Sequence, residues 1–228
     1  MKYLVRGIAA CALLLLMSGC AVTRSEMRLD LPAPGSAVVS GGQPLVIDSV
    51  RDVRVFEADP RDPSTPSLKK GAKYALDATG RKQAIARKRN TYGHAMGDIV
   101  LPSDENVETL TRQLLANAFA AHGYSVVDAA AAPADATHVS ADIQQFWAWL
   151  TPGFWSATIE AHIKTLLTIA GPSGTRKLTV KGYGRNSIQT GREANWQLAY
   201  HRAFEDYLKQ FDEAADNNGL QAATAASH

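Results

Sequence analysis

Apolar and polar residues alternate along several stretches of the chain, which is the pattern of strands that bury one face. The first stretch, 45–55, alternates imperfectly, so we expect a bulge or an early strand end near Arg51. Residues 124–127 return as a short strand. Three longer strands are then predicted, over 137–150, 154–170 and 177–188.

The same alternation predicts which side chains of these strands are buried. In the first long strand, one face carries Val139, Ala141, Ile143, Trp147 and Trp149. In the second long strand, the face opposite the aliphatic side chains carries Glu160, His162 and Lys164. We expect that second face to be in contact with water.

Two segments carry apolar residues at the three-and-four spacing of an amphipathic helix. The first opens at 103–105, where Ser103 or Asp104 can cap it, and ends at Gly123, the expected left-handed residue after the helix. The second runs from Arg192 to about Glu213. Its apolar positions are Trp196, Tyr200, Ala203, Phe204, Tyr207, Leu208 and Phe211.

The predicted order is therefore β-α-β-β-β-β-α, an α+β fold. We expect a two-layer sandwich, in which two helices cover one face of a mostly antiparallel sheet of about five strands. Residues 57–102 show no clear period, and Asp59-Pro60, Asp62-Pro63 and Thr65-Pro66 break any helix there. A connection of that length is usually functional or disordered.

The start of the chain has the three parts of a secretory signal peptide. Lys2 and Arg6 are positive, an apolar run extends over 7–17, and small residues precede Cys20. The run is too short to span a bilayer, which needs about 20 residues.

Met17-Ser18-Gly19-Cys20 resembles the bacterial lipobox, with Met17 in the place usually held by Leu. The resemblance implies diacylglycerol transfer to the Cys20 thiol, cleavage before Cys20 and acylation of the new amino terminus. Several acyl chains together hold a protein durably on a membrane. An Asp after the cysteine would resemble the inner-membrane retention signal, so Ala21 favours the outer membrane.

These features divide the chain into four parts. We expect a signal peptide over 1–19, lipid attachment and a flexible tether over 20–44, one α+β domain over 45–213 and a disordered tail over 214–228.

Composition narrows the possible functions. Without Lys2 and Arg6 the chain has 22 basic and 22 acidic residues, from totals of 24 and 22, so global attraction to nucleic acid is unsupported. Cys11 leaves with the signal and Cys20 carries the lipid, so no thiol remains for catalysis. The histidines lack metal-ligand spacing, and we predict no metal, no cofactor and no catalytic residue.

Parts of the domain resemble the YajG-like family of bacterial outer-membrane lipoproteins. The resemblance rests on three stretches: Val50-Arg51-Asp52-Val53-Arg54, 84–89 with Tyr92-Gly93, and 114–127 with Gly123-Tyr124. It covers roughly 46–211 and implies an outer-membrane lipoprotein without assigned catalytic residues.

A group of large aromatic residues surrounds the predicted Pro152-Gly153 turn. It consists of Phe146, Trp147, Trp149, Phe154 and Trp155. These residues either pack in the core or form an exposed tip, since aromatic residues are favoured as interface anchors and at membrane surfaces. The hypothesis is that the tip contacts a partner protein or the bilayer.

A second group is basic. It consists of Lys69, Lys70, Lys73, Arg81, Lys82, Arg87, Lys88 and Arg89. Either these residues belong to a solvated loop, or they contact anionic envelope material such as lipid headgroups. The second interpretation predicts binding that weakens with salt.

The sequence thus favours a non-enzymatic lipoprotein in the periplasmic leaflet of the bacterial outer membrane, anchored to the membrane by lipid on Cys20. We expect it to bind or brace another envelope component, with an envelope protein as partner. An alternative is a carrier or sensor of a small lipid or glycan, which requires an apolar groove between helices and sheet. An envelope hydrolase without a recognisable motif and a surface-exposed orientation also stay open.

Overall fold

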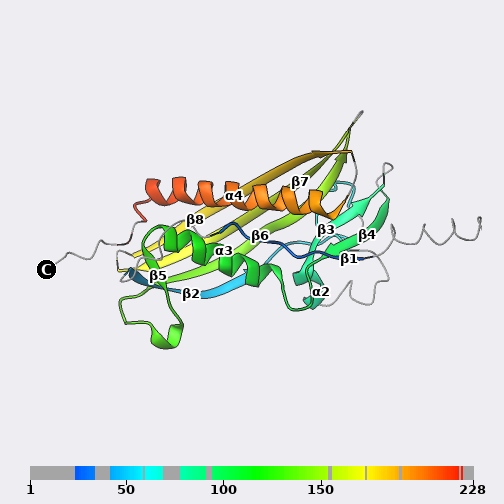
Figure 1. Ribbon diagram of the computed structural model, residues 1–228. Helices are drawn as coiled ribbons and strands as arrows, with labels where there is room; N and C mark the ends of the chain where they lie inside the picture. Colours follow the sequence, from blue (N-terminus) through cyan, green and yellow to red (C-terminus); the bar gives the residue numbers. More distant parts are fainter. Residues whose placement is uncertain are drawn as a thin grey trace, which may run out of the picture.

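The computed structural model describes residues 24–33, 42–58, 60–68, 78–90, 94–153, 156–172, 174–189, 192–220 and 222. In this part of the chain, one mixed sheet carries helices on one of its faces (Figure 1). Cys20, the first 23 residues and residues 34–41 of the predicted tether lie outside the described residues.

The elements follow one another from the amino end to the carboxyl end. The strands are β1 (Ser25–Glu26), β2 (Gln43–Asp52), β3 (Ala84–Arg89), β4 (Ala95–Val100), β5 (Tyr124–Val126), β6 (Thr137–Pro152), β7 (Ala157–Gly171) and β8 (Gly174–Ile188). The helices are α2 (Ala78–Gln83), α3 (Val107–Ala121), a 3-10 turn at Ala129–Ala131 and α4 (Glu193–Asn217).

The predicted five-stranded, mostly antiparallel two-layer sandwich is wrong. The sheet has eight strands and is mixed: β1 with β4, β2 with β5 and β6, and β3 with β6 are parallel pairs. The additional strands lie where no period was visible. β3 and β4 fall within 57–102, and β1 falls within the predicted tether.

β6 is the strand around which the sheet is assembled. Along one edge it pairs with β7 over nearly its whole length. Along the other edge it pairs first with β2, from Thr137 to Ile143, and then with β3 at Ala148. β2 and β3 therefore lie end to end beside one long strand.

A bulge in β6 exchanges the two faces of the strand halfway along. Ile143 pairs with Thr165 and Gln145 pairs with Lys164, so Gln144 is an additional residue on β6. A single inserted residue moves every later side chain to the opposite face. Trp147 and Trp149 therefore lie on the face away from the helices, and the prediction that they share a face with Ile143 is wrong.

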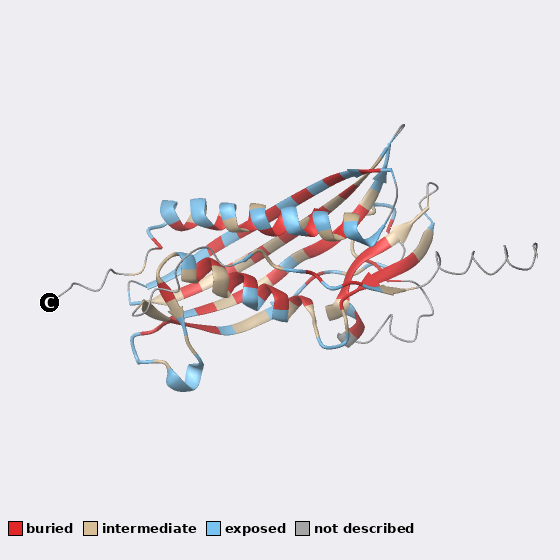
Figure 2. Ribbon diagram, in the orientation of Figure 1, coloured by how far each residue is buried: buried red, intermediate tan, exposed pale blue. Residues whose placement is uncertain are grey.

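Phe146, rather than Trp147 or Trp149, packs under the helices. Its ring stacks on Tyr200 at 5.4 Å and lies 6.0 Å from Phe204, both on α4. These three side chains are fully buried, and buried residues line the side of α4 that faces the sheet (Figure 2).

Two glycines of β8 allow α4 to lie directly on the sheet. A Cβ atom at Gly182 would overlap the carbonyl oxygen of Ala203, and one at Gly184 would overlap that of Ala199. Close backbone approach of this kind is a common reason for glycine inside a strand.

The ends of α3 differ in part from the prediction. Asn106, rather than Ser103 or Asp104, caps the helix: its side chain accepts from the Thr109 backbone N–H, and the Thr109 side chain accepts from the Asn106 backbone. Gly123 follows the helix with φ of 82°, which confirms its left-handed conformation.

Both ends of the described chain pack against the domain. Met27 and Leu29 are buried in the same core as α3 and α4, so this part of the predicted tether belongs to the fold. At the other end α4 continues to Asn217, and Ala215 and Leu220 are buried. The predicted disordered tail therefore cannot begin at 214; residues 223–228 lie outside the described residues.

A buried arginine holds β2, β3, β6 and α2 together. All five N–H groups of the Arg54 guanidinium donate hydrogen bonds: two to the Asp52 carboxylate, one each to the carbonyl oxygens of Ala84 and Phe146, and one to that of Arg81. The side chain of Arg54 is fully buried and that of Asp52 is 6% exposed.

We predict that Arg54→Ala lowers the free energy of unfolding by about 3–5 kcal/mol, because it leaves the Asp52 carboxylate buried without its partner. The measurement is urea unfolding followed by circular dichroism. Arg51→Ala, on β2 just before Arg54, is the control. Its pair with Asp142 is exposed, and its loss should cost at most about 1 kcal/mol. Equal losses for the two variants would contradict the assigned role of Arg54.

Candidate functional site

One end of the sheet gathers the amino end of the described chain and two hairpins. β1 is parallel to β4, with Ser25 opposite Ile99, so the chain enters β1 from the side where β4 begins. The start of β4 pairs with Arg89 at the end of β3, and β3 runs parallel to β6. The β3–β4 and β6–β7 hairpins and the entry to β1 therefore share one end, on the right in Figure 1.

This arrangement limits the distance between Cys20 and the folded domain. Only residues 21–23 separate Cys20 from Arg24, and Ser25 already pairs with β4. The five residue steps from Cys20 to Ser25 reach at most about 18 Å, at 3.3–3.6 Å per residue. The described chain therefore enters the sheet from this end, a few residues after Cys20. We refer to this end below as the proximal end.

The predicted aromatic tip does not form as a single exposed group. Phe146 and Trp147 are fully buried and Trp149 is 8% exposed. Trp147 packs against Phe56 at 6.0 Å, and its indole N–H donates to the Pro63 carbonyl oxygen. Phe146 packs under α4, Trp147 packs under the segment before α2 and Trp149 packs on His162, so the structure does not expose these three side chains as contact residues. Phe154 and Trp155 lie outside the described residues.

The predicted basic group is also divided. Lys82 forms a 2.7 Å ion pair with Glu108, whose other oxygen accepts from the Asp52 backbone N–H. Arg87 is buried beside Asp98 at 3.9 Å. Arg87 is therefore buried inside the domain, which argues against its assignment to an anionic-ligand contact, whereas the Lys82 side chain is 42% exposed and its assignment stays a prediction.

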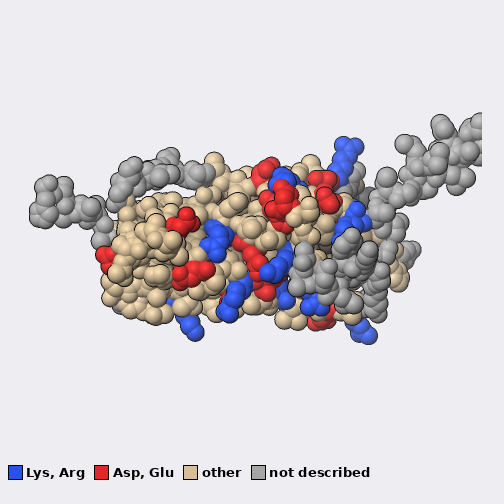
Figure 3. Space-filling view, turned by 90° about the horizontal axis from the view of Figure 1, so that it is seen from below, with Lys and Arg blue, Asp and Glu red and all other residues tan. Residues whose placement is uncertain are grey.

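The other described members of the basic group lie apart. Arg81 is exposed on α2, whereas Lys88 and Arg89 are half-buried at the end of β3, at the proximal end. Lys69, Lys70 and Lys73 lie outside the described residues. On the described face seen from below, basic and acidic side chains are interspersed (Figure 3). The described residues there form no broad patch of one sign.

A histidine occupies the sheet face that is turned away from the helices. The His162 ring lies 4.7 Å from Trp149 and 4.8 Å from Tyr183. Its Nε2 atom is buried and, among the described residues, has no hydrogen-bond partner. Burial therefore lowers the pKa of His162, although the nearby Glu160 carboxylate opposes the shift. The predicted wet face is thus only partly in contact with water.

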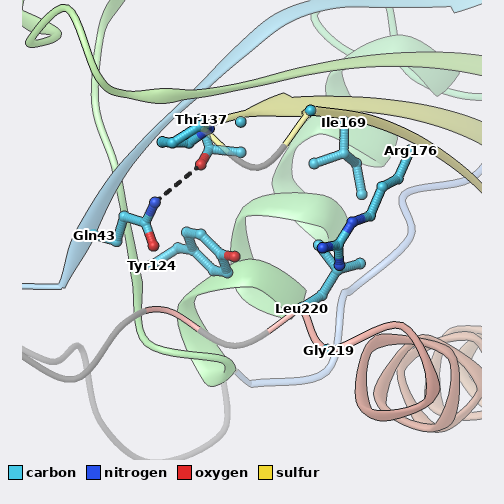
Figure 4. A pocket seen from close by; sticks show the side chains of 10 residues that line it. Gln43, Tyr124, Thr137, Ile169, Arg176, Gly219 and Leu220 are labelled. Atoms are coloured by element: carbon cyan, nitrogen blue, oxygen red, sulfur yellow. Dashed lines mark hydrogen bonds between the residues drawn. The ribbon is translucent and has the colours of Figure 1, made fainter.

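A small pocket lies at the opposite end of the sheet, which we call the distal end. It has a volume of about 290 Å³ and lies between the starts of β2 and β6, the β7–β8 turn and the end of α4. The amide of Gln43 donates to Thr137, and Tyr124 and Arg176 lie nearby (Figure 4). Arg176 donates to the Asn218 carbonyl oxygen, so it fastens the end of α4 to β8.

A second hollow, of about 620 Å³, lies between β2, α3 and the segment after β5. Inside it Arg112 of α3 donates to the carbonyl oxygen of Ile47 on the outer edge of β2. Glu108 accepts from Asp52 on the same edge. Arg112 and Glu108 of α3 thus hydrogen-bond to backbone groups of β2 that the short strand β5 does not reach. Within the described residues, no cluster of three His, Cys, Asp or Glu side chains could hold a metal ion.

Sequence reasoning missed Arg54, whose buried guanidinium makes five hydrogen bonds. A signal was present, because Asp52 and Arg54 carry opposite charges two residues apart on a strand and so project to the same side. Their burial was not visible, since the strands that cover them come from residues 84–89 and 137–152.

Comparison with known proteins gives no family assignment. No family model and no curated protein matches the sequence. Similar solved structures include an uncharacterised protein (7% identity, 88% of this chain, 98% of that chain, TM-score 0.39). Another is a Xanthomonas campestris protein of the family DUF330 (14% identity, 88% and 100% covered, TM-score 0.37). A third is a hypothetical protein from Chlamydia trachomatis (9% identity, 76% and 96% covered, TM-score 0.35).

These TM-scores are too low to establish a common fold. The three structures therefore carry no argument about the family or the function of this chain. Membership of the YajG-like family stays a prediction. In the described part of the chain, no helix is both long and apolar enough to cross a membrane.

We predict that protonation of His162 destabilises the domain. Its folded pKa lies below the ordinary value of 6.5, so the unfolded chain binds the proton more readily. Stability should therefore fall as the pH drops below about 6.5, until the lower folded pKa is reached. The measurement is the free energy of unfolding from pH 7.5 to 5. A His162→Gln variant should lose less stability over this interval than the wild type, and identical slopes would contradict the prediction.

Proposed function

We propose that the chain is a bacterial envelope lipoprotein, held by acyl groups on Cys20 in the periplasmic leaflet of the outer membrane. In this proposal the domain binds or braces another envelope component and catalyses no reaction. The observation that carries it is the spacing between the lipobox-like Met17-Ser18-Gly19-Cys20 and Ser25, the first residue of the sheet.

That spacing distinguishes a domain held at the membrane from one on a long tether. With a flexible tether of some 24 residues, the domain would reach roughly 25–30 Å from its lipid on average. With five residue steps it stays within about 18 Å. The proximal end, with both hairpins, would then remain against the headgroups, and the distal end would point into the periplasm.

The resemblance to YajG-like lipoproteins supports the same location. Two of its residues, Asp52 and Arg54, form the buried junction of β2, β3 and β6. Their structural role in this junction thus explains why these two residues occur in the resembling stretch.

The alternative, a lipid or glycan carrier, requires an apolar groove between helices and sheet. The described helix α4 instead lies directly on β8, with Gly182 and Gly184 against its backbone. The aromatic side chains of the interface are fully buried around Phe146. This packing leaves no internal carrier site between α4 and the sheet, so a carrier site would have to use the hollow between α3 and β2.

We expect the wild-type chain, expressed with its own signal, to begin at an acylated Cys20 and to fractionate with the outer membrane. Cys20→Ser should abolish acylation, because serine has no thiol to accept the diacylglycerol group. The measurements are mass spectrometry of the amino-terminal peptide and membrane fractionation. Ala21→Asp is the sorting test and should move the acylated protein to the inner membrane. An unmodified Cys20 in the wild type would refute the lipid anchor.

We also expect the proximal end to touch lipid. A photo-reactive residue at Thr151, exposed at the proximal end, should crosslink to phospholipid in intact cells. The same residue at Ala130, exposed beside the distal end, is the control and should not. Inserting twelve Gly and Ser residues after Ala21 should reduce the Thr151 crosslinks while the protein stays in the membrane. Equal lipid labelling at both positions would exclude the proposed orientation.

A further inference from the structure

The outer edge of β8 differs from every other edge of the sheet. Among the described strands, β8 pairs only with β7, over 15 residues without a register shift. The other outer strands, β1 and β5, have two and three residues. The outer edge of β2 is occupied by Arg112 and Glu108. Long uncovered edges are rare, because they can pair with another chain.

Two backbone contacts show which residues of β8 point outward. The Tyr183 N–H donates to the Asp206 carboxylate at 2.9 Å, and the Arg185 carbonyl oxygen accepts from Arg202, both partners lying on α4. In an antiparallel strand, the N–H and C=O of one residue point to the same side, and that side alternates along the strand. The odd-numbered residues of β8 therefore present their backbone groups to the outer edge.

α4 satisfies this edge only over 183–185. The register with β7 is unbroken, so Lys177, Thr179 and Lys181 turn their N–H and C=O groups outward as well. In the described structure these groups make no hydrogen bond. The uncovered edge thus extends over residues 175–181, about 20 Å of strand. It lies in the distal half of β8, away from the proposed membrane contact.

The side chains along this edge are basic. Lys177 and Lys181 are exposed, and Lys181 lies directly opposite Lys164 of β7. Like charges directly opposite one another destabilise a sheet. Within the described residues none of the three lysines has a carboxylate within 4.0 Å. An incoming carboxylate would relieve this repulsion.

These lysines also disfavour a second copy of the same edge. Antiparallel pairing of two copies about Thr179 would place Lys177 of each copy opposite Lys181 of the other. Two like-charged pairs would then face each other. The charge pattern therefore selects a different strand, one with acidic residues at both positions.

We propose that the β8 edge over 175–181 is a docking site for an extended acidic segment of a partner protein, which adds a ninth strand to the sheet. The segment has Asp or Glu opposite Lys177 and Lys181 and apolar residues opposite Leu178 and Val180. Backbone hydrogen bonds supply affinity, and alternate side chains supply specificity. This inference rests on the proposed binding function but not on acylation of Cys20.

The test uses the full mature chain in detergent and a blocked, fluorescein-labelled peptide, Thr-Glu-Val-Thr-Val-Glu-Thr. A peptide with Lys in place of both Glu residues is the control. Fluorescence anisotropy should show the Glu peptide binding about tenfold more tightly than the Lys peptide. Its affinity should fall with added salt. No preference for the Glu peptide would overturn the proposal.

Amide hydrogen exchange measured by NMR locates the bound peptide. The N–H groups of Lys177, Thr179 and Lys181 should become protected, whereas those of Leu178 and Val180, which face β7, should not change. Protection elsewhere, or none, would overturn the assignment to this edge.

Two variants separate strand addition from general attraction of charge. Thr179→Pro removes one outward N–H and should weaken the Glu peptide about tenfold, while Thr179→Ala should bind it like the wild type. The double variant Lys177→Glu with Lys181→Glu should prefer the Lys peptide, which keeps the test decisive even if the proline variant does not fold. Because no membrane is present, a failure here is distinct from a failure of Cys20 acylation.

Discussion

The architecture depends on one buried cation. Arg54 lies where β2 ends and β3 begins beside β6, and two strands placed end to end leave carbonyl groups there without ladder partners. The Arg54 guanidinium donates to the carbonyl oxygens of Ala84, Phe146 and Arg81, and Asp52 neutralises its charge. A guanidinium suits this position because its donors are planar, fixed and always charged. The arginine therefore fills the gap between two parallel partners of a single strand.

The two halves of β6 therefore pack against different strands and helices. Before Gln144 the strand lies between β2 and β7, and α3 packs close to β2. After Gln144 it lies between β3 and β7, and Phe146 faces α4 while Trp147 faces the segment around Phe56 and Pro63. A single inserted residue thus gives the proximal half of the sheet an aromatic core on each face. The proximal hairpins extend from a part of the sheet that is packed on both sides.

The long strands and both long helices could be predicted from the sequence, since each carries its own period over ten residues or more. The faces of β6 could not, because the exposed Gln144 resembles any polar residue of an alternating strand. β3 escaped detection because Arg87, a charged residue, is buried beside Asp98. Parallel pairing leaves no local signal at all. The lipobox-like motif was readable because it is a local chemical signature, whereas the proximal end exists only through pairings between distant strands.

The order of the strands in the sheet also bears on how the chain reaches its fold. β6, β7, β8 and α4 follow one another directly, so this block can assemble from neighbouring segments. β1 and β2, by contrast, find their partners at Ile99 and Thr137, far along the sequence, and closing such long loops slows folding. Until β2 and β3 have docked, one edge of β6 is without a partner. We therefore expect the open edge of β6 to be the place where the folding chain is most exposed to mispairing with other chains.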